Sequence, residues 1–255
     1  MKRRSIFLCS LALCLSITGC SGAAASSSAS TTSSSVSASA SSTSVDTAQA
    51  DYSNQTITGK VVSMDGTSVT LQLDIFDSTI TTTADNSGGI QTTGGGTTNA
   101  SNLTVETSGN SAAAIRSDRG GGTVNVDEGT YTSNVYNSPA VYSTADITVS
   151  NAALTANNSE ALVIEGSNSI TLNDCDVTGN MSDTEGTSSD ENVHNVMIYQ
   201  SMSGDAEVGT SSFSMTGGSL TAKNGDMFYI TNTHSVISLS GVSITNEDED
   251  ANLMT

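Results

Sequence analysis

Carboxylate side chains gather at two places in the sequence where they could bind a metal ion. The segments 182–193 and 247–250 are both rich in acids, and Ca²⁺ prefers several oxygen ligands of the kind that flexible acidic loops supply. Neither segment matches an EF-hand or a calcium-binding nonapeptide repeat, so a plain solvated loop is the alternative interpretation. The candidate calcium ligands are Asp183, Glu185, Asp190 and Glu191.

Two arginines and three tyrosines are candidates for direct contact with a ligand. Arg116 and Arg119 bracket Asp118 in a Gly-rich turn, a pattern that is also typical of an exposed ion pair with little effect on stability. Tyrosine rings could stack on the sugars of a polymer, and the candidates for this role are Tyr142, Tyr199 and Tyr229. Tyr142 and Tyr229 adjoin positions that should face inward, so we expect their rings to point outward.

The histidines and the internal cysteine show no motif of nucleophilic or acid–base catalysis. His194 and His234 have no motif neighbours and are interpreted as satisfied or solvated side chains. Cys175 lies between Asp174 and Asp176, and successive residues of a strand point to opposite faces. We therefore expect Cys175 to be a buried spacer and both acids to point outward.

The N-terminus resembles that of a bacterial lipoprotein precursor. Lys2, Arg3 and Arg4 precede an apolar run from Ile6 to Ile17 that is too short for a comfortable membrane span. The run ends in Ile-Thr-Gly-Cys20, which resembles the bacterial lipobox and implies cleavage before a cysteine that receives two acyl chains. Residues 1–19 are predicted to be the signal peptide, with an ordinary signal peptide as the alternative. The mature chain would be exported and held on the outer face of the cell membrane by lipid on Cys20.

The mature chain would be strongly acidic. The whole sequence has 7 basic and 26 acidic residues, and removal of the three N-terminal basic residues leaves a net charge of −22. Such a surface repels nucleic acid, so no nucleic-acid partner is expected. Tryptophan is absent, and a composition rich in Ser, Thr, Asn and Gly is typical of an exported all-β protein.

Two different segments connect the predicted anchor to the rest of the chain. Residues 20–50 are almost entirely Ser, Ala and Thr, which cannot build a core, so they are predicted to be a disordered tether. Residues 51–75 contain two alternating runs around Asp65-Gly66, which is a strong hairpin signal. We expect this hairpin to cover the first coil of the domain that follows.

Apolar residues recur from residue 73 onward in triplets, with two residues two apart and a third five residues later. The triplets are Leu73, Ile75, Ile80; Val124, Val126, Tyr131; Ile147, Val149, Leu154; Ile170, Leu172, Val177; Phe213, Met215, Leu220; and Ile237, Leu239, Ile244. Another unit is assigned to Leu103 and Val105, without a third member. The central triplets repeat every 23 residues, and the longer interval from Ile170 to Phe213 is interpreted as one coil with an insertion of about 20 residues. Each repeat describes one coil whose apolar side chains point into a shared interior.

The turn after the third strand of a coil repeatedly carries asparagine, whose amides can stack from coil to coil. The asparagines are Asn134, Asn157, Asn180 and Asn224. With this coil length and strand pattern, residues 73–255 resemble the pectin-lyase-like superfamily of right-handed parallel β-helices, with about 6–7 coils. They are also similar in style to β-helical surface lipoproteins and carbohydrate-binding β-helix proteins of Gram-positive bacteria. Residues 251–255 begin like another strand, so they either cap the last coil or lead into a longer chain.

The resemblance implies two classes of function, and a third hypothesis stands beside them. We expect a non-catalytic, membrane-anchored surface protein that binds extracellular polysaccharide or acts as an adhesin. The superfamily also contains calcium-dependent polysaccharide lyases and glycosidases, in which Arg116 or Arg119 would serve as the base and the acidic segment would hold calcium. A purely structural surface stalk is the third hypothesis.

Overall fold

The computed structural model describes residues 36–37, 58–65, 68–182, 192–204 and 206–255. The predicted signal peptide, Cys20, most of the predicted tether and the acidic candidates Asp183, Glu185, Asp190 and Glu191 lie outside these residues. The described residues contain no helix, and so none that is long and apolar enough to cross a membrane.

The strands form a parallel β-solenoid of about seven turns, which confirms the predicted all-β fold. The main path of the larger sheet runs through β1 (Val36–Ser37), β2 (Thr58–Asp65), β3 (Ser68–Phe76), β6 (Thr97–Thr107), β8 (Thr123–Ser133), β10 (Asp146–Ala156), β12 (Ser169–Asn173), β15 (Thr210–Thr216) and β18 (His234–Ser240). Its side branches are β4 (Thr79–Thr82), β13 (Asp176–Gly179), β16 (Ser219–Ala222) and β19 (Ser243–Asn246). The second sheet contains β5 (Ile90–Thr93), β7 (Ile115–Asp118), β9 (Val141–Ser143), β11 (Leu162–Glu165), β14 (His194–Tyr199) and β17 (Asp226–Thr231).

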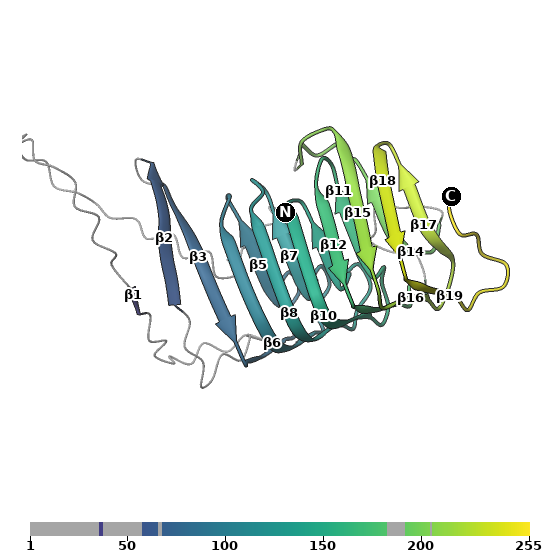
Figure 1. The fold of residues 1–255 in the computed structure, drawn as a ribbon, viewed down its shortest axis with the longest axis horizontal. Coiled ribbons are helices and arrows are strands. Elements are labelled where there is room, and N and C mark those ends of the chain that lie inside the picture. The colour runs from purple at the N-terminus through teal and green to yellow at the C-terminus, as the bar shows by residue number, and fades with distance from the viewer. Residues whose placement is uncertain (1–35, 38–57, 66–67, 183–191, 205) are drawn as a thin grey trace, which may run out of the picture.

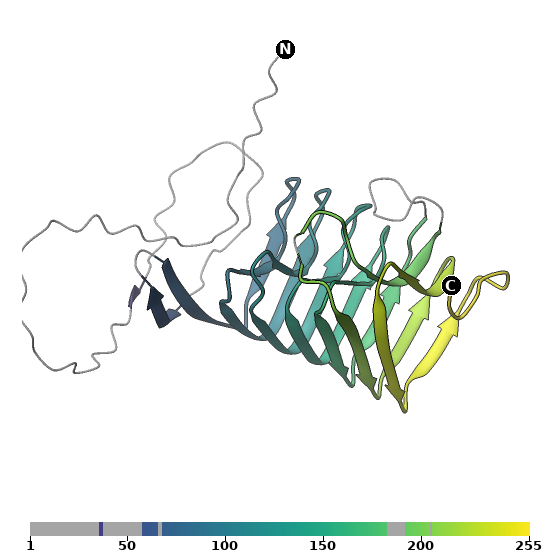
Figure 2. The ribbon, with the colours of Figure 1, turned by 90° about the horizontal axis from the view of Figure 1, so that it is seen from above.

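The coils stack along the long axis of the molecule, with the hairpin at one end (Figure 1). Strands β2 and β3 pair antiparallel with Asp65 opposite Ser68, and β3 then pairs parallel with β6, so the predicted hairpin leads directly into the first coil. Strand β1 lies within the predicted tether and pairs with β2. Figure 2 shows the stack from above, with the last coil in yellow at the end opposite the hairpin.

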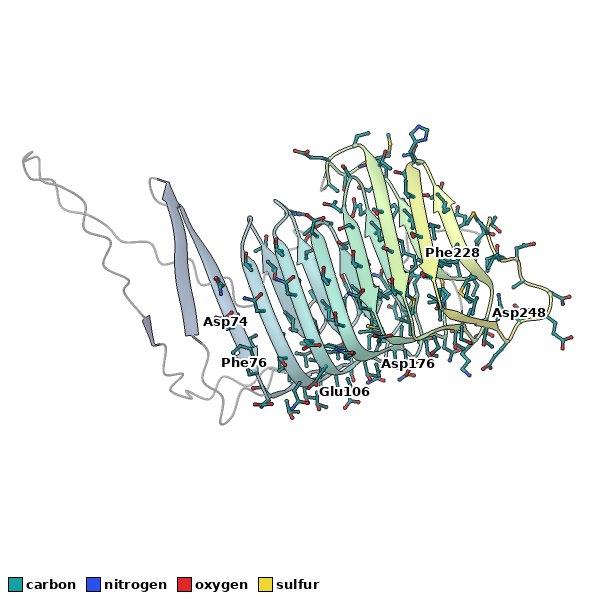
Figure 3. The ribbon with its side chains drawn as sticks, viewed as in Figure 1. Asp74, Phe76, Glu106, Asp176, Phe228 and Asp248 are labelled. Atoms are coloured by element: carbon teal, nitrogen blue, oxygen red, sulfur yellow. The ribbon has the colours of Figure 1, made fainter. Side chains whose placement is uncertain are left out.

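The predicted apolar columns fill the interior. Val126 pairs with Val149 and Val149 pairs with Leu172, and all three side chains are buried. Strand β12 pairs directly with β15, which confirms one coil enlarged by an insertion. Cys175 is fully buried, and burial raises the pKa of its thiol above the ordinary value. Figure 3 shows its neighbour Asp176 and the more distant Glu106 projecting outward from the stack.

The coil assigned to Leu103 and Val105 was placed wrongly. Thr98 and Ala100 pair with Val124 and Val126, so they are the first two inward residues of this coil and Val105 is the third. Thr98 is polar, so a search for recurring apolar residues does not identify it as an inward position. Its buried hydroxyl oxygen lies 2.7 Å from that of Thr92, and this hydrogen bond offsets the cost of burying the group.

Two kinds of turn recur along the solenoid. Each coil has a residue with φ between 48° and 70° at the corner before the third inward position, namely Asp77, Asn102, Glu128, Asn151, Asp174, Gly217 and Gly241. At a different corner the predicted asparagine ladder is present, since the Asn157 amide donates to the Asn134 side chain at 2.7 Å and the Asn224 amide donates to that of Asn180 at 2.8 Å. The ladder asparagines have no positive φ, so side-chain hydrogen bonding, not left-handed backbone, explains them.

Residues 251–255 run alongside β17. The amides of Met227 and Phe228 donate to the carbonyls of Asn252 and Leu253 at 3.0 and 3.1 Å, and Thr255 returns a bond to Phe228 at 2.9 Å. These bonds confirm that the last residues begin to pair as another parallel strand.

Candidate functional site

The outer face of the second sheet carries an apolar cluster where the other outward positions are mostly polar. Parallel pairing places Arg116, Tyr142, Val163, Met197 and Tyr229 in one outward row across β7, β9, β11, β14 and β17. Val163 and Met197 are only 4 % and 1 % exposed. The tyrosines at 142, 199 and 229 pack around them, so the cluster forms a small second core outside the solenoid.

A hollow of about 150 Å³ opens beside this cluster. We call it the tyrosine pocket, and its main lining residues are Arg116, Tyr142, Glu160, Val163, Met197 and Tyr199. Turn residues Ser111, Asn137 and Pro139 close one side. The pocket therefore combines aromatic rings, apolar side chains and charged groups, as ligand sites commonly do.

Arg116 is held firmly at the pocket. Its guanidinium donates to Asp118 at 3.2 Å and to the backbone oxygen of Ser111 at 3.2 Å, and its central carbon lies 5.1 Å from the Tyr142 ring centroid. The predicted local ion pair is thus present, together with a cation–π contact. Arg119 is not among the pocket residues, and its carbonyl oxygen accepts hydrogen bonds from Thr93 and Gly94.

The hydroxyl groups of the pocket tyrosines converge on Glu165, which is 1 % exposed. Tyr142 and Ser201 donate to its carboxyl group, and Tyr199 donates to it at 3.1 Å. Burial, followed by the neighbouring Tyr199 and Glu165, raises the pKa of Tyr142 above its ordinary value. The Tyr142 hydroxyl therefore remains protonated, and the hydrogen bonds of Tyr142 and Tyr199 to Glu165 fix the two rings in place.

Glu160, His194 and Asp226 form a second polar cluster beside the pocket. They occupy equivalent positions in three neighbouring coils, at or just before the start of a strand of the second sheet. His194 Nε2 lies 3.6 Å from a Glu160 oxygen, and Nδ1 donates to the Asn192 carbonyl at 2.6 Å. The imidazole also stacks on Tyr229 with 5.1 Å between ring centroids. This group borders the apolar cluster and places one buried carboxyl group, that of Glu160, in the pocket wall.

The carboxyl groups of Glu160 and Asp226 both have lowered pKa values. Burial opposes ionisation of Glu160, but the facing His194 and the Ser159 hydroxyl outweigh it and lower the pKa of this carboxyl group. Burial also opposes ionisation of Asp226, and hydrogen bonds from Thr255 and Asn252 outweigh it in the same way. Both groups therefore bind protons more weakly in the folded protein than in the unfolded chain.

Acid should consequently destabilise the fold. Stability from these two groups is complete above their ordinary pKa near 4 and is lost as the pH falls through the lower folded values. We expect a melting temperature that changes little from about pH 7 to 5 and drops below about pH 4. Glu160→Gln should make this drop shallower, whereas Glu249→Gln, at an exposed site, should not. Equal pH profiles in all three chains would rule out the contribution of Glu160.

The structure brings together three of the five residues proposed from sequence for ligand contact, and the four calcium candidates lie outside the described residues. Arg116, Tyr142 and Tyr199 line one pocket, and the rings of Tyr142 and Tyr229 lie on the outer face as predicted. Tyr229 packs against the cluster but does not line the pocket, and Arg119 lies outside it. Glu160 and Glu165 were not proposed from sequence, and His194, interpreted from sequence as satisfied or solvated, is buried and contacts Glu160, the Asn192 carbonyl and Tyr229.

Within the described ranges, no group of three or more His, Cys, Asp or Glu side chains could hold a metal ion. Comparison with protein-family models, with curated proteins and with solved structures finds no match for this chain.

Proposed function

We propose that this chain is a non-catalytic cell-surface lipoprotein whose solenoid binds an extracellular polysaccharide through the tyrosine pocket. The observation that carries the proposal is the cluster of tyrosine and apolar side chains on an otherwise polar outer face. This cluster lies outside the solenoid interior beside a hollow, and a hollow lined by apolar, aromatic and charged side chains is typical of ligand sites.

The chemistry of the pocket suits a sugar ring. Sugars present apolar C–H faces and hydroxyl groups, which tyrosine rings and buried polar groups respectively can contact. Hydrogen bonds to Glu165 hold the rings of Tyr142 and Tyr199, so little side-chain entropy is lost on binding. The small volume of the hollow supports recognition of one ring or one chain end of a polymer.

The arrangement of Arg116 supports binding over catalysis. Its guanidinium is paired with Asp118 and stacked on Tyr142. An arginine side chain stays protonated in proteins. A lyase base would have to give up this proton, so a role in positioning a ligand fits the geometry better.

The proposed anchor comes from the N-terminal sequence. Two acyl chains on Cys20 are sufficient for stable attachment, and the Ser-rich segment would carry the solenoid away from the membrane surface. Membrane fractionation of cells that express Cys20→Ala tests this part, since the variant should leave the membrane fraction. Undiminished membrane association of the variant would refute lipid anchoring.

Glycan binding by the purified chain tests the function itself. On a panel of cationic, neutral and anionic polysaccharides we expect one class to bind, and Tyr142→Ala should weaken that binding at least tenfold, or about 1.4 kcal/mol, as for an aromatic hot spot. Tyr136→Ala is the matched control, because this tyrosine does not line the pocket. Circular dichroism should show that both variants retain the β-fold. The proposal fails if no polysaccharide binds, or if both variants bind as the unmodified chain does.

A further inference from the structure

We infer that the polysaccharide bound at the tyrosine pocket carries positively charged amino groups, so that the pocket receives an amino sugar and rejects a uronate. This inference rests on the proposed function and specifies the class of its ligand. Three features of the described residues support it: a buried carboxyl group in the pocket wall, an excess of acids around the pocket, and a tyrosine ring, that of Tyr142, that already contacts a cation.

Glu160 provides the carboxyl group that would meet an ammonium group. Its side chain is almost completely buried yet lines the pocket. One oxygen accepts a hydrogen bond from Ser159 at 2.5 Å, and the other lies 3.6 Å from His194 Nε2, which is its ion-pair partner. Because a carboxylate oxygen accepts more than one hydrogen bond, the oxygen beside His194 could also accept a charge-assisted one from a ligand N–H group. The lowered pKa of this carboxyl group keeps it ionised at neutral pH.

The balance of charge around the pocket favours a cation. Arg116 is the basic residue of the pocket lining, and Asp118 at 3.2 Å offsets its charge. Glu160 and Asp226 lie beside one histidine, His194, and Glu165 accepts hydrogen bonds from neutral hydroxyl groups, so acids outnumber bases around the pocket. The whole sequence has a net charge of −19, so the long-range potential also concentrates cations. A uronate would have to approach the carboxyl groups of Glu160 and Glu165 against like-charge repulsion.

The aromatic side of the pocket is suited to the same ligand. The faces of tyrosine rings attract cations, and Arg116 already lies 5.1 Å from the Tyr142 ring centroid. Val163 and Met197 line the hollow but are almost fully buried, so the half-buried ring of Tyr142 would meet the C–H face of the sugar. An amino sugar offers both an ammonium group and such a face on one ring.

Calorimetry of the purified full chain with three hexasaccharides tests the inference: glucosamine, N-acetylglucosamine and galacturonic acid oligomers, each at low and high salt near pH 6. We expect the glucosamine hexamer to bind at least tenfold more tightly than the other two, with an affinity that falls as salt increases. Glu160→Gln should weaken glucosamine binding at least tenfold. Glu249→Gln, which removes one exposed negative charge, should leave it within twofold.

The outcomes separate this inference from the proposed function. Equal binding of the acetylated hexamer, or tighter binding of galacturonate, would overturn the amino-sugar inference while leaving polysaccharide binding intact. Unchanged glucosamine binding by a folded Glu160→Gln chain would also overturn it. If Glu160→Gln does not fold, the acetylation and salt comparisons on the unmodified chain decide alone. Absence of binding to every glycan would refute both proposals.

Discussion

Replacement of Leu172 by alanine is expected to lower the free energy of unfolding by about 2–5 kcal/mol. Leu172 is fully buried in the solenoid interior and pairs with Val149 in the preceding coil and Met215 in the following one. Truncation removes its apolar contacts and leaves a cavity between two coils, which the stacked backbones cannot close without losing register. Urea denaturation followed by circular dichroism measures the effect.

Thr171→Ala is the matched control for this prediction. Thr171 is the neighbour of Leu172 in β12, points to the outer face and is half-buried. Its truncation should change stability by no more than about 0.5 kcal/mol. Similar losses in both variants would contradict the assignment of an inward and an outward face to β12, and with it the shared interior.

The fold could be predicted from sequence because its interior repeats a simple requirement. Every coil must present apolar side chains at the same inward positions, so columns such as Val126, Val149 and Leu172 appear as spaced apolar residues. The assignment of inward residues was wrong for the coil that contains β6, where a polar residue occupies an inward position. Thr98 fills an inward position as a polar residue whose hydroxyl group is paired with Thr92, and no apolar pattern can reveal such a pair.

The candidate site could be predicted only in part, because its members are separated by irregular intervals. Arg116, Tyr142, Val163, Met197 and Tyr229 form one row, yet they lie 26, 21, 34 and 32 residues apart in sequence. The variable turns and the insertion break the 23-residue period at this face. Residue type identified the arginine and the tyrosines, whereas the row itself requires the strand register.

The sequence signal for Glu160 and Glu165 was weaker than that for the arginine and the tyrosines. Glu165 ends the apolar run Leu162-Val163-Ile164, which indicates a buried strand but does not show that Val163 and Glu165 point outward. Glu160 lies in the turn before that strand and contacts His194 from the next coil. The insertion separates these two residues in sequence, so only the stacked coils show that they face each other.

Replacement of Gly218 by alanine should also destabilise the solenoid strongly. Gly218 has φ +69°, a region that residues with a side chain rarely adopt. An added Cβ would lie 1.9 Å from the Cys175 carbonyl oxygen and 2.8 Å from the Cys175 carbonyl carbon. That oxygen accepts the Ser219 amide at 2.9 Å, so the clash would fall on a hydrogen bond that joins two coils.

The size of the effect follows from two separate costs. Left-handed backbone at a residue with a side chain costs about 1–3 kcal/mol, and overpacking adds typically 1–3 kcal/mol. Gly94→Ala separates the backbone cost from the overpacking cost, because Gly94 has φ +62° but a Cβ there would meet nothing within 4 Å. Gly94→Ala should therefore show the backbone cost alone, and Gly218→Ala should lose about 1–3 kcal/mol more in urea denaturation.

Gly218→Ala could avoid these costs if the corner changed its backbone conformation. The comparison with Gly94→Ala would detect such a change. Ala152 and Cys175 occupy the equivalent position in the two preceding coils without positive φ, so the backbone at this corner has a second conformation that accommodates a side chain. Gly218→Ala could reach it only if Gly217 and the bond between Ser219 and Cys175 rearranged together. A loss no greater than that of Gly94→Ala would mean that the corner converts freely, and that stacking of the coils does not depend on the glycine.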